Sequence, residues 1–135
     1  MNWSLDDAGK LLLRLLVGGL LILHGFHKLV SGPGGVAGML SAHGVPGVFA
    51  YAVYLGEVLG PSLMLLGVYA RIGALLAVAN MLVAVLVSHG LNVFHLNDYG
   101  GWEIELELFF GVGALCVALL GAGAYSAAGK GGKFN

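Results

Sequence analysis

The sequence predicts an all-α fold, an integral membrane four-helix bundle with a short interfacial segment between helices one and two. Composition is the first reason: 59% of the 135 residues are hydrophobic and 10% are charged. The mean hydropathy of +0.92 lies well above the range of soluble domains. The second reason is that apolar runs recur at about the length of a spanning helix, roughly 20 residues. The lipid bilayer is therefore the expected surrounding, and residues 1–135 are expected to form one domain.

The first spanning helix is predicted over residues 8–30, where an apolar run is long enough to cross a hydrocarbon core of about 30 Å. The glycine- and proline-containing segment 31–35 then ends it. Residues 36–47 are too few to span, so they are expected to lie at the interface with about two helical turns.

The first helix also carries Arg14, His24, His27 and Lys28 within its apolar sequence. At about 100° per residue, the last three fall on one side, and Arg14 lies near the same stripe about four turns below. A charge in hydrocarbon is costly, so these residues are expected to face protein, water or an interface.

The next apolar stretch is about twice a spanning length, and Arg71 interrupts it. A charged residue in so long a run is best placed at an aqueous boundary. We therefore expect one helix over residues 48–68 and another over residues 71–89, joined as a tight hairpin. Gly60-Pro61 predicts a local kink in the first of these.

A polar loop follows from His89 to Trp102, and the last helix is predicted over residues 103–121. Residues 122–135 are rich in glycine and lysine, which predicts a flexible tail.

Four spans place both ends on one side of the membrane. Positive residues concentrate on that side, so both termini are predicted to be cytoplasmic; these residues are Lys10, Arg14, Arg71, Lys130 and Lys133, against Lys28 alone on the other side.

This topology brings ionisable residues from four helices to one level near the outer side. Glu57 is the deepest carboxylate, about nine residues into its helix, and Glu57 with His24 is the candidate pair for catalytic proton handling. The candidate substrate-binding residues of the same pocket are Arg14, Lys28, His27, His89, Glu103 and Glu107.

Motifs over nearly the whole chain resemble the DoxX family of small four-helix membrane proteins. The residues that carry the resemblance are Arg14, Gly25, Lys28, Gly44-Val45-Pro46, Glu57, Gly67-x-x-x-Arg71, Asn80-Met81, Glu103, Glu107 and Gly121 to Ser126. Two departures are Gly60-Pro61, where the family more often has a glycine pair, and a tail without the family's proline and terminal aspartate. The resemblance implies a multi-pass protein of the cell membrane, the inner membrane in bacteria. It also implies a link to quinol oxidase, thiosulfate oxidation or oxidative-stress systems.

Several residues have a structural alternative to a functional role. Arg14 either snorkels to headgroups or forms an ion pair inside the bundle. Glu57 either handles protons or forms a structural ion pair with Lys28 or a histidine. His89 lies near Glu103 and Glu107 in the predicted topology, but no tight HxxxH or ExxH spacing is present, so no metal site is predicted.

Three functions remain open at this point. The first is a quinone-linked redox role, with quinone as the possible cofactor or substrate of the outer pocket. The second is a non-catalytic anchor or assembly subunit that binds redox-enzyme subunits, or a second copy of the chain, through glycine-rich helix faces. A small transporter is less well supported, because the inner half offers few ionisable residues. The net charge of -1 and the absence of a basic patch predict no nucleic-acid partner.

Overall fold

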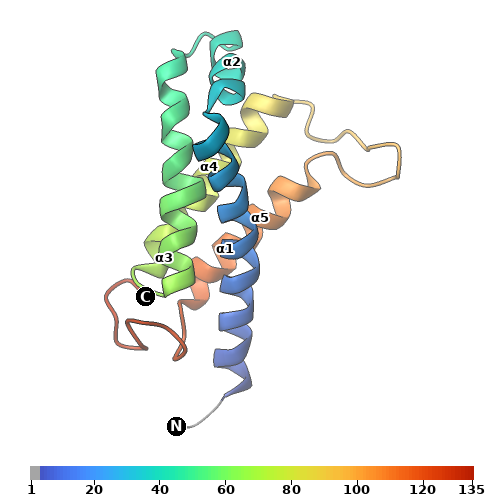
Figure 1. Cartoon of the computed structure of the whole chain (residues 1–135). Coiled ribbons are helices and arrows are strands. Elements are labelled where there is room, and N and C mark those ends of the chain that lie inside the picture. The colour runs from blue at the N-terminus through green and yellow to red at the C-terminus, as the bar shows by residue number, and fades with distance from the viewer. Residues whose placement is uncertain (1–3) are drawn as a thin grey trace.

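The computed structural model describes residues 4–135 and is all-helical over that range (Figure 1). Five α-helices and two short helices of other types follow one another along the chain. Their bounds are α1 Leu5–Ser31, α2 Gly34–Ala42, η1 Gly47–Ala52, η2 Leu55–Leu59, α3 Gly60–Leu66, α4 Ala70–His89 and α5 Glu105–Leu120. Three stretches are long and apolar enough to cross a membrane, namely Leu5–Ser31, Gly47–Leu66 and Ala70–His89.

Helix α1 begins three residues earlier than the sequence predicts, because Ser4 caps it. The Ser4 hydroxyl accepts a hydrogen bond from the backbone N–H of Asp7, which satisfies one of the free donors of the first turn. Asp6 and Asp7 also lie in that turn, where the helix dipole favours negative charge. Gly32, with φ of 79°, ends the helix.

The second membrane-capable stretch is not a regular α-helix. It begins as the 3₁₀-helix η1, continues as the π-helix η2 and finishes as α3. Pro61 has no N–H to donate to the carbonyl of Glu57 four residues earlier, and its ring crowds that carbonyl, so the α-helical pattern cannot run through this point. The sequence predicts a kink at Gly60-Pro61, and the structure places a π-turn directly before it.

Helix α4 begins at Ala70, one residue from the predicted start, and ends at His89 as predicted. Helix α5 has 16 residues and is shorter than the predicted span of residues 103–121. The reason lies in the preceding loop, where Trp102 forms an isolated bridge with Leu96 and donates its indole N–H to the carbonyl of Val93. Residue 102 is therefore held in the loop, and the helix starts after Ile104.

The core lies where α1, α3, α4 and α5 meet. Helix α4 contributes small side chains, Ala74 and Ala77, both fully buried, so its neighbours approach closely. Gly73 packs directly on Gly60 of α3, and a Cβ at either position would press on the other's carbonyl. The larger residues of the core are Val17, Leu21, Met64, Met81, Phe110 and Val117.

The C-terminal segment 122–135 lies against the end of the helices where α1 and α4 begin, which is named the inner end here; the opposite end, near α2, is the outer end. Hydrogen bonds fix this segment, whereas the sequence predicts a flexible tail. The N–H of Ala127 donates to the carbonyl of Leu66 at 2.9 Å, and the N–H of Ala124 donates to Asp7 at 2.9 Å. Lys130 pairs with the same carboxylate at 2.9 Å. The N- and C-terminal parts of the chain therefore meet at one end of the molecule, opposite α2 (Figure 1).

Candidate functional site

Glu57, the acid that the sequence predicts to lie deepest in the membrane, lies in the π-turn and is 5% exposed. Its Oε2 is 2.5 Å from Nζ of Lys28 on α1, and its Oε1 accepts a hydrogen bond of 3.1 Å from Nδ2 of Asn80 on α4. Both carboxylate oxygens are thus paired. A buried charge with a counter-ion and a second hydrogen bond needs no proton to be tolerated. This saturated cluster of Lys28, Glu57 and Asn80 ties three helical elements together.

Two glycines make that cluster possible. Gly25 of α1 lies against the backbone carbonyl of Glu57, and a Cβ there would overlap it. Gly56 lies against the side chain of Asn80 in the same way. Close approach of α1 and α4 to the π-turn therefore depends on the absence of two side chains. Tyr54 adds a further link, since its hydroxyl donates to the carbonyl of Lys28 at 2.8 Å.

A second polar cluster lies where α4 ends and α5 begins. Nε2 of His89 is 3.5 Å from Oε1 of Glu107, and Nδ1 is 3.9 Å from Oε2 of Glu103. The side chains of His89 and Glu107 are 20% and 22% exposed. Neither distance is that of a tight hydrogen bond, so the donor and acceptor sites of these groups are not saturated by one another.

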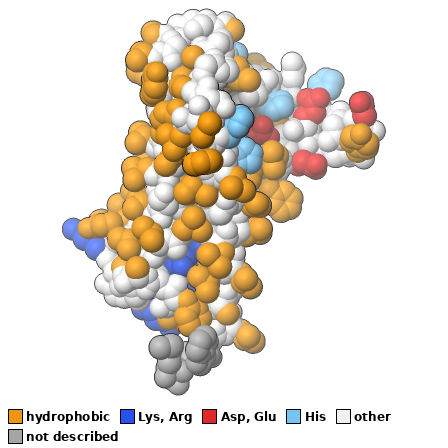
Figure 2. All heavy atoms as spheres, in the orientation of Figure 1, with side chains coloured by type: hydrophobic (Ala, Val, Ile, Leu, Met, Phe, Trp, Pro, Cys, Tyr) orange, Lys and Arg blue, Asp and Glu red, His pale blue; other side chains and the backbone are white. Residues whose placement is uncertain are grey.

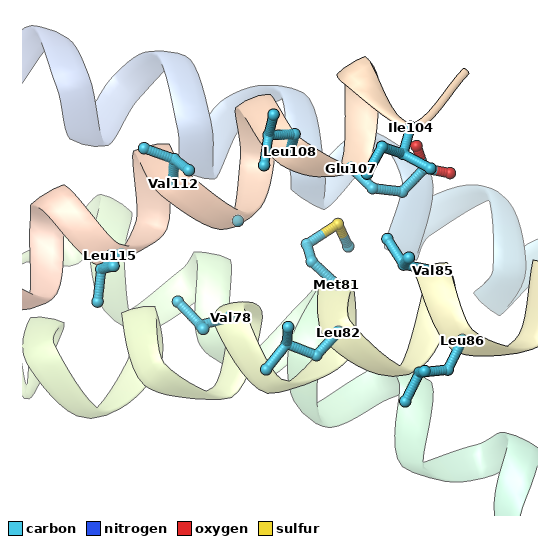
Figure 3. A pocket seen from close by; sticks show the side chains of 11 residues that line it. Val78, Met81, Leu82, Val85, Leu86, Ile104, Glu107, Leu108, Val112 and Leu115 are labelled. Carbon is cyan, nitrogen blue, oxygen red and sulfur yellow. The ribbon is translucent and has the colours of Figure 1, made fainter. Parts of the chain in front are cut away.

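The His89 cluster adjoins a groove between α4 and α5 with a volume of about 440 Å³ (Figure 3). Glu107 contributes to one end of the groove together with Ile104, Val85 and Leu86, and the rest of the lining is apolar. Val78 and Leu115 lie at the opposite, inner end in Figure 3. The groove is therefore almost wholly apolar, and Glu107 is the one ionisable residue in its lining.

Charged side chains of opposite sign lie at opposite ends of the surface. Figure 2 shows histidine and acidic side chains gathered over the end of the molecule that carries the α4–α5 loop, and lysine and arginine at the opposite end. Over residues 4–135, no group of three or more His, Cys, Asp or Glu side chains is arranged to hold a metal ion.

The structure separates the residues that the sequence places in one outer pocket. His24 is exposed; its ring packs edge-on against Phe110, at 5.6 Å between centroids, and its Nδ1 is 3.1 Å from the carbonyl of Leu20, so it does not contact Glu57. His27 is exposed as well, with no ion pair or hydrogen bond to the part of the chain that the structure describes. The predicted pocket is thus two clusters, the saturated one around Glu57 and the open one around His89.

Arg14 lies in neither cluster. It is 1% exposed and sits at the other end of α1, where Nη1 donates to the carbonyl of Ala122 and Nη2 to that of Tyr125, both at 2.9 Å. Of the two predicted alternatives, the structure has Arg14 inside the bundle, but its partners are backbone carbonyls and not a carboxylate. Snorkelling to headgroups is excluded by this burial.

Sequence reasoning missed Asn80 as a partner of Glu57. In the sequence, Asn80 contributes only to the Asn80-Met81 pair of the family resemblance. The available signal was its polarity in an otherwise apolar run, because a polar side chain at that depth needs a hydrogen-bond partner on a neighbouring helix.

Comparison with known proteins supports the resemblance seen in the motifs. A family model described as DoxX matches residues 9–90. The matched segment contains α1 from residue 9 onward, the π-turn with Glu57, and all of α4, so it covers the saturated cluster completely. No curated protein and no solved structure matches the chain. The match covers more than half of the sequence, and the chain is therefore a member of the DoxX family of membrane proteins.

Proposed function

We propose that the chain is a four-span protein of the bacterial inner membrane with both termini in the cytoplasm. The meeting of the two ends of the chain at one side of the molecule supports an even number of crossings (Figure 1). Helix α5 is the fourth span. Its 16 residues extend about 24 Å, and a short span is accommodated by local thinning of the bilayer. Helix α2 is the interfacial segment on the periplasmic side, and the lysine- and arginine-rich end lies in the cytoplasm.

Within that membrane, the protein serves quinone-linked redox metabolism by binding a quinone or quinol in the α4–α5 groove. A quinone combines a ring carrying two oxygens with a long hydrocarbon chain. The groove offers apolar side chains along its length and Glu107 at its outer end. His89 lies 3.5 Å from Glu107 and 3.9 Å from Glu103, so His89 and Glu103 lie next to that end without lining it. This pairing of an open polar cluster with an apolar groove is the observation that carries the proposal.

The chemistry of the donor set fits a quinone head group. A neutral or protonated imidazole donates a hydrogen bond to a quinone carbonyl, and the carboxylate of Glu107 accepts one from a quinol hydroxyl. The 3.5 Å between His89 and Glu107 leaves these groups able to turn toward a ligand. When bound, a quinone supplies the two-electron chemistry, while the side chains bind the head group and hold or accept protons at its oxygens.

Glu57 has a structural role in this proposal. Lys28 and Asn80 each contact one of its two carboxylate oxygens, so the acid already has partners on α1 and α4. His24 lies on an exposed face beside Phe110 and takes no part in ligand binding.

The test is binding of a short-chain ubiquinone analogue to the purified protein in lipid nanodiscs, followed by tryptophan fluorescence and calorimetry. We expect His89→Ala and Glu107→Gln each to weaken binding about tenfold, the value of one hydrogen bond to a ligand. His43→Ala is the matched control, because the His43 side chain is exposed and bonds only to the carbonyl of Met39 in the preceding helix α2. Equal affinity in all four proteins, or no binding in the wild type, would remove the groove from quinone chemistry.

A second function, a non-catalytic subunit of a redox complex, is favoured by a separate groove on the other flank of α5. This groove of about 380 Å³ lies between α1 and α5, and no ionisable side chain other than Cys116 lines it. Phe109 is 80% exposed beside it. A helix of another redox subunit, or of a second copy of the chain, is a suitable occupant for such a surface in lipid. Purification in mild detergent tests this function, and a protein that is always alone and monomeric would argue against it.

A further inference from the structure

Arg71, in the first turn of α4, touches three parts of the molecule at once. Its Nη1 donates to the carbonyls of Ala118, at 2.6 Å, and Leu119, at 2.9 Å, in the last turn of α5. Its Nε donates to the backbone oxygen of Asn135 at 3.0 Å, and its own N–H donates to the carbonyl of Phe134 at 3.1 Å. One guanidinium therefore connects the start of α4, the end of α5 and the C-terminal segment.

The contacts with α5 are of a kind that stabilises a helix end. The last four carbonyls of an α-helix have no partner inside the helix, and the helix dipole places partial negative charge there. A guanidinium that donates to two of these carbonyls supplies the missing hydrogen-bond donors and places a positive charge next to the partial negative charge. Gly121 leaves the room for it, because a Cβ there would lie 2.9 Å from Nη2 of Arg71 and from the backbone oxygen of Asn135.

The C-terminal segment is in turn fixed to α1 by two buried charged residues. Arg14 donates to the carbonyls of Ala122 and Tyr125. Asp7, 1% exposed, accepts from the N–H of Ala124 and pairs with Lys130. Removing the segment would leave both buried charges without these partners, which is costly. Attachment of the segment to α1 is therefore strongly favoured.

The contacts between Arg71 and α5 lie just beyond the inner end of the α4–α5 groove. Val78 and Leu115, which line that end, lie seven residues after Arg71 on α4 and three residues before Ala118 on α5. At 1.5 Å per residue, the Arg71 contacts lie within about 10 Å of this end along either helix axis. The outer end of the groove, near Leu86, is about 22 Å from Arg71 along α4 by the same rise.

We infer that residues 122–135 and Arg71 form a latch that sets the spacing of α4 and α5 at the inner end of the groove. With the latch closed, α5 is held against α4 at its C-terminal end. With the latch open, α5 loses its links to Arg71 and to the C-terminal segment, and the inner end of the groove widens. The C-terminal segment thus controls the groove from the end opposite to the His89 cluster. This inference concerns the geometry of the groove and holds for any occupant, quinone or other.

The test measures the groove directly, by electron paramagnetic resonance of pairs of nitroxide labels on the full chain in nanodiscs. Cys116→Ser removes the native thiol. One label pair, at Val78→Cys and Leu115→Cys, reports the inner end, and a matched pair at Leu86→Cys and Leu108→Cys reports the outer part of the same groove (Figure 3). Each pair is measured with the latch intact, with Arg71→Gln and with Ala127→Pro. The last variant removes the N–H that donates to Leu66 and leaves the Arg71 side chain in place.

We expect Arg71→Gln to shift the inner pair to longer and broader distances and to leave the outer pair unchanged. Ala127→Pro is expected to produce a smaller shift of the inner pair in the same direction. An inner pair that is unchanged in both variants, or an equal shift of both pairs, would overturn the latch. A shift with Arg71→Gln alone would overturn the part assigned to the C-terminal segment. If Arg71→Gln does not fold, Arg71→Lys replaces it, since an ammonium keeps the charge but lacks the planar fork.

Discussion

The two polar clusters of this protein have similar ingredients and opposite construction. In the Glu57 cluster, each carboxylate oxygen has a partner within 3.1 Å, and the acid is 5% exposed. In the His89 cluster, the nearest pair is at 3.5 Å, and the histidine side chain is 20% exposed. A buried cluster whose charged oxygens both have close partners holds helices together, whereas a looser and partly exposed cluster is available to a ligand. The two clusters contain similar residue types. What distinguishes the structural cluster from the candidate ligand site is how closely its polar atoms are paired.

The largest effect is expected when the saturated cluster loses its acid. Glu57→Ala leaves Lys28 without a counter-ion and Asn80 without its acceptor, and we expect a loss of about 3 kcal/mol in the free energy of unfolding. Unfolding in detergent, followed by circular dichroism, measures it. Asp98→Asn is the control, an exposed carboxylate in the α4–α5 loop. If both variants were equally stable, the contacts of Glu57 with Lys28 and Asn80 would not hold the helices together as described.

A smaller loss is expected from packing next to the same cluster. Gly25→Ala places a methyl group on the carbonyl of Glu57 and is expected to destabilise by about 2 kcal/mol. Gly19→Ala, on the same helix, is the matched control, because nothing lies within 4 Å of the added carbon. That variant is expected to be neutral or slightly stabilising, since alanine is the better helix former. Equal behaviour of the two alanines would show that α1 does not approach the π-turn closely.

The open cluster is expected to tolerate change. Glu107→Gln and His89→Gln each remove one partner of a loose and partly solvated pair, so the loss of unfolding free energy should stay below about 1 kcal/mol. The same thermal or denaturant measurement applies to both clusters. A loss as large as that of Glu57→Ala would mean that the His89 cluster is structural too, and it would remove the basis of the proposed ligand site.

The smallest effect concerns the pair at the inner end, Asp7 and Lys130. The hydrogen bond and charge of Asp7 raise the pKa of Lys130 above its ordinary value. Because the folded state holds this proton more tightly, the pair stabilises the protein fully below the ordinary lysine pKa. The contribution is lost as the pH rises through the raised pKa. Wild-type protein should therefore lose stability at alkaline pH more steeply than Lys130→Gln, as measured by unfolding temperature at several pH values. Parallel curves would contradict the pairing.

The sequence was sufficient for the elements that depend on hydrophobicity and on single charges. The apolar runs predicted α1 and α4 to within a few residues, and Arg71 marked the break before α4 as expected. Glu57 was predicted to require a partner because of its depth, and Lys28 was one of the alternatives named for it. The local irregularity at Gly60-Pro61 was also predicted, because proline removes a donor regardless of tertiary context.

The C-terminal segment could not be predicted, because it contributes mainly its own backbone groups to these contacts. Arg14 bonds to carbonyls of Ala122 and Tyr125, and carbonyls are present at every position of a sequence. A run rich in glycine has no hydrophobic period, so its composition predicts a linker even where buried charges on another helix hold it in place. The sequence also could not show that the predicted outer pocket is two separate clusters. Residues at one depth can face different directions, as His24 and Glu57 do.

The π-turn at Leu55–Leu59 has a consequence for comparing this chain with others. A π-turn accommodates one residue more than an α-helix of the same path, and each residue of an α-helix rotates its side chain by about 100°. A relative that builds this stretch as an uninterrupted α-helix would therefore need one residue fewer to aim its acid at the same lysine. Aligning two such chains without a gap would pair Glu57 with a neighbour of the true equivalent, and a homology model built on that alignment would turn the acid away from its partner.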